Sequence, residues 1–307
     1  MAQVRTRTGG RTGARTAARP VPRTADQALV LGGGGLAGIA WETGMLLGLA
    51  EAGVDVSGAE LMVGTSAGST VGAQLGSGRS LEDLFAAQCG PDTSALQVDV
   101  DLGAFLATVG ERLAGITDRR EGRRRIGALA MAARTPPEAA RLVDIEARLP
   151  SKNWPGWPLL LPAVDCATGE RRVFTRESGV PLPLAVAASC AVPGIWPATT
   201  IEGRRYMDGG IHSSTNALLA AGARRVVILA PLPDVAGPLS EGLDAEIGEL
   251  RAGGAELVVV TPDEASVEAF GRNPLDPATR RPAALAGRRQ AAEEARAVRE
   301  VWGRTEV

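Results

Sequence analysis

The sequence has 307 residues, of which 45% are hydrophobic, 22% charged and 3% aromatic, with a net charge of −2. This composition fits a globular protein with an aliphatic core, and no uninterrupted apolar run approaches the roughly 18–20 residues that span a membrane. Six arginines precede the first acidic residue, Asp26, and without them 27 basic residues face 35 acidic ones. The remaining net charge of −8 argues against a nucleic-acid-binding domain.

Residues 1–25 form a separate compositional segment, rich in Arg, Thr, Gly and Ala. They lack the apolar stretch of a secretion signal, and we expect them to be a disordered tail. Attraction of this tail to anionic lipid headgroups is an open alternative. We expect residues 26–307 to form a single domain. The three cysteines are widely spaced and form no CxxC pair, so neither a zinc site nor a disulfide framework is indicated.

The first predicted strand, residues 28–31, runs into a glycine loop, residues 32–38, and then into a helix that extends to about Ala52. Strand, glycine loop and helix together place backbone N–H groups where they can surround an anion. Two interpretations compete. Gly33, Gly35 and Gly38 satisfy the Gly-x-Gly-x-x-Gly pattern of dinucleotide-binding proteins. The loop can equally supply the donors of an oxyanion hole, which must lie beside a nucleophile.

The next apolar run, residues 61–64, favours the oxyanion hole. A dinucleotide-binding fold has an acidic residue after its second strand. Here the strand leads instead into Gly64-Thr65-Ser66-Ala67-Gly68, a Gly-x-Ser-x-Gly pattern. Glycines on either side allow a sharp strand-to-helix turn that exposes the central serine at a helix N-terminus. Because the ends of neighbouring parallel strands meet at one sheet edge, we expect the glycine loop and Ser66 to be neighbours.

Residues 90–157 interrupt the strand pattern. Helices are predicted at 67–75 and 81–88, and further helical patterns follow at 102–113, 120–133 and 137–149, with no clear strand between them. Such a helical insertion could cover the site as a cap. The arginine-rich run Asp118–Arg125 is predicted to be a solvated helix face, and contact with a membrane surface is the alternative.

Strand character returns after residue 157, in an order typical of a mostly parallel sheet flanked by helices. The predicted elements are a hairpin of strands 159–165 and 171–174, a helix at 182–188, a second hairpin that turns at Glu202-Gly203, buried strands at 225–229 and 256–260, and a long helix at 282–302. A rigid loop with two prolines spans residues 189–197, and its Trp196 either lines a pocket or fills the core. The second hairpin ends in Asp208-Gly209-Gly210, which can hold a carboxylate against the backbone.

Three motifs therefore follow one another: Gly33-Gly34-Gly35-Leu36-Ala37-Gly38, Gly64-Thr65-Ser66-Ala67-Gly68 and Asp208-Gly209-Gly210. In this order and at these spacings, the chain resembles the patatin-like phospholipase family over roughly residues 27–231. The Thr-Gly turn within residues 165–170 and the proline-bounded loop agree with the family pattern. The resemblance implies an α/β fold: a three-layer α/β/α sandwich with a mostly parallel central sheet, related to the α/β-hydrolases.

The resemblance also implies a catalytic Ser–Asp dyad. Ser66 would be the nucleophile, Asp208 its general base, and the N–H groups of Gly33, Gly34 and Gly35 the oxyanion hole. His212, the only histidine, would be a neighbour of the site, with a Ser–His–Asp triad as the alternative. Ala37 departs from the family, which often has a basic residue there. A phospholipid substrate is therefore less clearly indicated than acyl hydrolysis itself.

The expected function is hydrolysis of lipid or other acyl esters of the phospholipase A, lysophospholipase or esterase type, by way of an acyl-enzyme. No metal or other cofactor is expected, since no cluster of His, Cys and Asp has ligand spacing. We expect a cytoplasmic protein, with peripheral contact with a membrane as an option, and the oligomeric state is left open. The alternatives are a catalytically silent binder of lipids or partners, and a dinucleotide-binding oxidoreductase.

Overall fold

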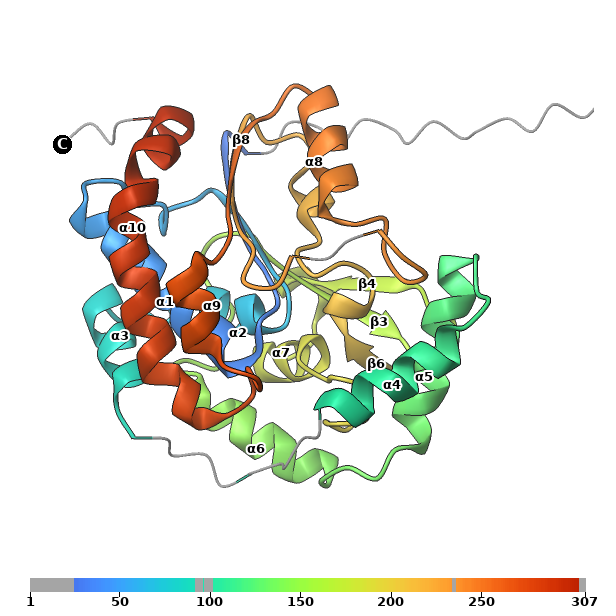
Figure 1. Ribbon diagram of the computed structural model, residues 1–307. Helices are drawn as coiled ribbons and strands as arrows, with labels where there is room; N and C mark the ends of the chain where they lie inside the picture. The colour runs from blue at the N-terminus through green and yellow to red at the C-terminus, as the bar shows by residue number, and fades with distance from the viewer. Residues whose placement is uncertain (1–24, 92–95, 97–101, 234–235, 304–307) are drawn as a thin grey trace, which may run out of the picture.

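The computed structural model describes residues 25–91, 96, 102–233 and 236–303 (Figure 1). The predicted disordered tail, residues 1–25, lies almost wholly outside them. In the described part, strands form one central sheet of eight strands. They are β1 (Gln27–Leu31), β2 (Leu61–Gly64), β3 (Leu159–Asp165), β4 (Arg171–Phe174), β5 (Thr199–Ile201), β6 (Arg204–Asp208), β7 (Arg225–Leu229) and β8 (Glu256–Val260).

The sheet has the order β5-β6-β3-β2-β1-β7-β8, with β4 paired to β3 outside this path. The pairs β3–β2, β2–β1, β1–β7 and β7–β8 are parallel, whereas β3 pairs with β4 and β6, and β6 with β5, in antiparallel fashion. The β1–β2 register pairs Leu31 with Gly64, so both strands end at the same sheet edge. The predicted α/β class with a mostly parallel sheet is confirmed. The prediction that residues 256–260 are a buried strand is wrong, because β8 is an edge strand in which only Val260 is buried.

Ten α-helices occur in the described residues. They are α1 (Gly35–Glu51), α2 (Ala67–Leu75), α3 (Leu81–Cys89), α4 (Leu102–Leu113), α5 (Arg119–Ala132), α6 (Glu138–Arg148), α7 (Leu182–Ser189), α8 (Leu243–Ala252), α9 (Glu264–Phe270) and α10 (Arg280–Trp302). On one sheet face, Leu29, Leu31 and Met62 share a hydrophobic core with α1, α2, α7 and α10. On the other face, Ala28, Val30 and Val63 pack with α8. Helix, sheet and helix thus form three layers.

Helices α1 and α10 lie side by side because glycines remove the side chains between them (Figure 1). A Cβ atom at Gly44 would lie 2.0 Å from the carbonyl oxygen of Ala284, and one at Gly287 would lie 2.3 Å from that of Trp41. The two backbones therefore touch directly, and this seam fixes α1 against the C-terminal helix.

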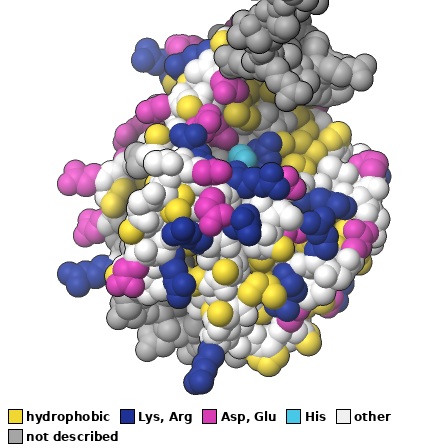
Figure 2. All heavy atoms as spheres, turned by 90° about the vertical axis from the view of Figure 1, so that its right-hand side faces the viewer, with side chains coloured by type: hydrophobic (Ala, Val, Ile, Leu, Met, Phe, Trp, Pro, Cys, Tyr) yellow, Lys and Arg dark blue, Asp and Glu magenta, His cyan; other side chains and the backbone are white. Residues whose placement is uncertain are grey.

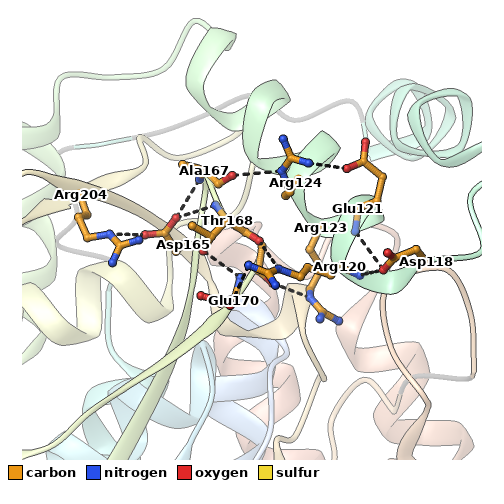
Figure 3. Close-up of polar contacts among 11 residues, drawn as sticks. Asp118, Arg120, Glu121, Arg123, Arg124, Asp165, Ala167, Thr168, Glu170 and Arg204 are labelled. Carbon is orange, nitrogen blue, oxygen red and sulfur yellow. Dashed lines mark hydrogen bonds and ion pairs between the residues drawn. The ribbon is translucent and has the colours of Figure 1, made fainter. Parts of the chain in front are cut away.

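Arginines of α5 hold the β3–β4 turn (Figure 3). The Nε groups of Arg120, Arg123 and Arg124 donate to the carbonyl oxygens of Thr168, Gly169 and Ala167, at 3.0, 2.8 and 3.3 Å. Arginine and carboxylate side chains alternate on the face that carries α4 and α5 (Figure 2). The arginine-rich run is therefore accounted for by contacts within the fold. No helix of the described residues is long and apolar enough to cross a membrane.

Candidate active site

Ser66 stands on a strained turn between β2 and α2. Its backbone has φ 51° and ψ −110°, a left-handed conformation that non-glycine residues rarely adopt. The flanking glycines make the turn feasible. A Cβ atom at Gly64 would lie 2.5 Å from the Gly68 carbonyl oxygen, and one at Gly68 would lie 2.2 Å from the Leu31 carbonyl oxygen. The turn therefore places Ser66 at the N-terminus of α2, where it lines a pocket, although the residue is buried and not exposed as the sequence predicted.

Asp208 lies at the end of β6 and faces Ser66. The Ser66 hydroxyl donates to Asp208 Oδ2 at 2.7 Å, and the Gly210 N–H donates to Oδ1 at 2.7 Å. Burial raises the pKa of Asp208 to about 6, although the hydrogen bonds from Ser66 and Gly210 and the charge of Arg141 oppose this shift. A carboxylate with a pKa near neutrality is a suitable proton acceptor for a serine.

The glycine loop lies against the nucleophile. A Cβ atom at Gly33 would be 3.6 Å from Cβ of Ser66, so Gly33 lies beside the Ser66 side chain. The Gly33 N–H, one of the three donors expected from the sequence, is already engaged, since it donates to the Ser214 carbonyl oxygen at 2.7 Å. Gly34 and Gly35 stand at the N-terminus of α1, where N–H groups have no partner within the helix. Gly35 and Ser66 line the same pocket.

His212 lies close to Asp208 in sequence but faces another cavity, together with Arg119, Arg123 and Glu246. Its Nδ1 is buried and has no hydrogen-bond partner in the described part of the chain. Burial, with the charges of nearby arginines, lowers the pKa of His212 to about 3. The hydrogen bonds that join Ser66, Asp208 and Gly210 do not involve His212, so the structure brings Ser66 and Asp208 together without it.

Ser66 opens into a pocket of about 500 Å³. Its apolar walls include Leu36, Ile39, Ile145, Leu275 and Trp196, and the two arginines Arg141 and Arg148 also line it. Trp196 thus lines the pocket, one of the two roles that the sequence left open. Because Arg141, Ile145 and Arg148 belong to α6, the helical insertion contributes one wall of the pocket.

Three residues that support the site were not predicted. The Ser66 N–H donates to Ser189 Oγ at 3.1 Å, and the Cys190 thiol donates to the Ser66 carbonyl oxygen at 3.1 Å. Burial raises the pKa of Cys190, so its thiol stays protonated. The buried Asn216 donates from Nδ2 to Thr65 Oγ1 and to the Gly209 carbonyl oxygen, both at 3.2 Å. It thereby joins the two loops that carry Ser66 and Asp208.

Ser189 and Cys190 lie at the start of the proline-bounded loop, which was the signal for them in the sequence. Asn216 had no such signal. Among the side chains that the structure describes, no three of His, Cys, Asp and Glu converge as metal ligands.

A family model, patatin-like phospholipase, matches residues 29–221, which include the glycine loop, Ser66 and Asp208. The chain belongs to this family. Patatin-like phospholipases act on lipid esters, and membership places the chain among lipid acyl hydrolases. In this patatin-like chain β2 ends in the Ser66 turn, where a dinucleotide-binding fold has an acidic residue.

Solved structures of two bacterial proteins resemble the chain at low identity. The crystal structure of VipD from Legionella pneumophila has 13% identity and a TM-score of 0.44, with 89% of this chain and 67% of VipD covered. ExoU, a type III effector, has 16% identity and a TM-score of 0.39, with 91% of this chain covered. A structure of SpcU in complex with ExoU from Pseudomonas aeruginosa has 16% identity and a TM-score of 0.34, with 91% of this chain and 53% of that chain covered. The chain spans about half the length of ExoU, at 54%. No curated protein sequence matches the chain significantly.

Proposed function

We propose that this patatin-like protein hydrolyses carboxylic esters of lipids through an acyl-enzyme formed on Ser66, with Asp208 as the general base. The observation that carries the proposal is the 2.7 Å hydrogen bond from the Ser66 hydroxyl to Asp208 Oδ2, on a turn that opens into the pocket. A serine needs a base within this distance in order to attack an acyl carbonyl.

The reaction proceeds in two steps. Ser66 Oγ attacks the acyl carbonyl carbon while its proton passes to Asp208 Oδ2. When the tetrahedral intermediate collapses, the bond to the alcohol breaks and the alcohol leaves with that proton. A water molecule then attacks the acyl-enzyme, again giving a proton to Asp208. The fatty acid leaves and the proton returns to Ser66.

The negative charge of each tetrahedral intermediate needs hydrogen-bond donors that are already in place. We assign this role to the N–H groups of Gly34 and Gly35, at the N-terminus of α1, where the helix dipole also favours negative charge. Gly33 belongs to the same loop, but its N–H donates to Ser214, so its role is to hold the loop beside Ser66.

Labelling with a fluorophosphonate probe, together with release of p-nitrophenol from a short acyl ester, tests the proposal. Ser66→Ala is expected to abolish both, and Asp208→Asn to reduce turnover by at least about 10³-fold. His212→Ala serves as the matched control and is expected to keep most of the activity. If labelling is absent in the wild type, or if His212→Ala removes turnover while Asp208→Asn does not, the assignment is wrong.

A further inference from the structure

Two arginines of the pocket have no part in the dyad mechanism. Arg141 and Arg148 of α6 line the same cavity as Ser66 and flank Asp144, with which both form ion pairs. Their spacing of three and four residues from Asp144 places all three on one face of α6. The Arg148 Nη2 group lies 3.2 Å from Asp144 Oδ2, the oxygen that Arg141 also contacts.

This cluster has more positive than negative charge. Two guanidinium groups share the carboxylate of Asp144, and the side chains of Arg141 and Asp144 are only 8% and 2% exposed. The Nε groups of Arg141 and Arg148 are buried and have no hydrogen-bond partner among the residues that the structure describes. The cluster thus places net positive charge in the wall of the pocket, which favours a bound anion.

Arg141 is also held firmly and lies close to the reacting groups. Its guanidinium carbon lies 3.7 Å from the centre of the Trp196 ring, a stacked arrangement that fixes its orientation. Its charge also opposes the rise in the pKa of Asp208. Arg141 forms its ion pair with Asp144, whereas the oxygens of Asp208 accept from Ser66 and Gly210.

The glycine loop cannot supply the missing charge. Residues 32–38 include no charged side chain, and Ala37 is fully buried in the hydrophobic core. Within the described residues of the pocket lining, Arg141 and Arg148 are therefore the cations, and Asp276 at the exposed rim is the remaining charged residue besides them. Guanidinium groups match the geometry of phosphate oxygens.

We propose that Arg141 and Arg148 bind a phosphate in the alcohol part of the substrate, and so select anionic acyl esters over neutral ones. This role presupposes the ester hydrolysis proposed above. Positive charge that the glycine loop lacks is thus supplied by the helical insertion, more than 100 residues further along the chain than Ala37.

The test compares two substrates with the same acyl chain, oleoyl-lysophosphatidylglycerol and monooleoylglycerol, in micelles of one neutral detergent at pH 8. This pH lies well above the pKa of about 6 of Asp208, so the base is ionised in the wild type. Arg141→Gln and Arg148→Gln are expected to lower kcat/KM for the phosphate ester by roughly tenfold or more, chiefly through KM, and for the neutral ester by less than about threefold. Arg141→Lys keeps the positive charge and should retain part of the preference for the phosphate ester that Arg141→Gln loses.

Controls separate selectivity from folding. Arg296→Gln removes an exposed arginine of α10 and should leave kcat/KM unchanged for both substrates. If Arg141→Gln unfolds because Asp144 loses its partner, the double variant Arg141→Gln/Asp144→Asn removes both charges of the pair together.

Equal losses on both substrates, or a wild type that shows no preference for the phosphate ester, would overturn the proposed role while ester hydrolysis stands. If the wild type cleaves neither substrate and Ser66 is not labelled by a fluorophosphonate, the proposed function fails, and the arginines' role fails with it.

Discussion

The pKa of Asp208 predicts how the rate depends on pH. Burial raises this pKa to about 6 from a usual value of 3.8, and the base must be ionised to accept the Ser66 proton. A carboxylic acid with that pKa is roughly nine-tenths ionised at pH 7 and roughly one-tenth at pH 5. We therefore expect kcat/KM to fall by about tenfold between pH 7 and pH 5. With an ordinary aspartate, the rate would change little over this range.

The measurement is the release of p-nitrophenol from a short neutral ester, recorded at a wavelength where the absorbance of the product does not depend on pH. Arg141→Gln should move the acidic limb to higher pH, because Arg141 favours the ionised form of Asp208. His212→Ala should leave the limb in place, since the pKa of His212 is lowered to about 3 and its ring is neutral throughout. A flat profile between pH 5 and pH 8, or loss of the limb in His212→Ala, would refute the reasoning.

Three further predictions concern the residues that support the site. Gly68→Ala would place a Cβ atom 2.2 Å from a backbone oxygen of β1, so we expect it to destabilise the protein by at least about 2 kcal/mol in urea unfolding, whereas Gly58→Ala, with open space around it, should be nearly neutral. Asn216→Ala removes the hydrogen bonds that join the loops carrying Ser66 and Asp208, and it is expected to lower the free energy of unfolding by about 2 kcal/mol in the same assay. Asn153→Ala, at an exposed position, is the control, and equal effects of the two variants would contradict the explanation. Burial raises the pKa of Glu42 well above its usual 4.5. The Gly32 backbone opposes this rise only in part, since neither carboxyl oxygen of Glu42 accepts a hydrogen bond of normal geometry from the described residues. The folded protein therefore holds that proton to higher pH than the unfolded chain, and stability is lost as the pH rises from about 4.5 through the raised pKa. Glu42→Gln cannot lose a proton, so its gain in Tm over the wild type should be larger at pH 8 than at pH 5, and an equal gain at both would contradict this explanation.

The sequence predicted the parts of the molecule that depend on local signals. Helix α4 has the predicted limits, Leu102–Leu113, because its apolar periodicity is uninterrupted. The turn at Ser66 followed from the glycines on either side, each of which proves to be needed for close backbone contact. The strand at residues 256–260 was placed correctly but judged buried, since an apolar run does not reveal which strand lies at the sheet edge.

What the sequence could not provide depends on distant partners. The Gly33 N–H looked available until the Ser214 carbonyl was placed beside it, 181 residues later. Likewise, Arg141 and Arg148 resemble any charged pair on an amphipathic helix. Their importance comes from the cavity that α6 shares with Ser66 and Trp196, and helix periodicity cannot predict that contact.

The backbone seam between α1 and α10 also bears on where this patatin-like protein can be divided. The matched segment ends at residue 221, yet the loop and helix at its start are held from beyond that point. Gly32 donates to Leu229, Ala37 donates to Pro274, and Gly44 touches Ala284. A fragment cut where the match ends would keep Ser66 and Asp208 but lose the supports of the proposed oxyanion donors. The family match therefore covers a shorter segment than the one that these contacts join.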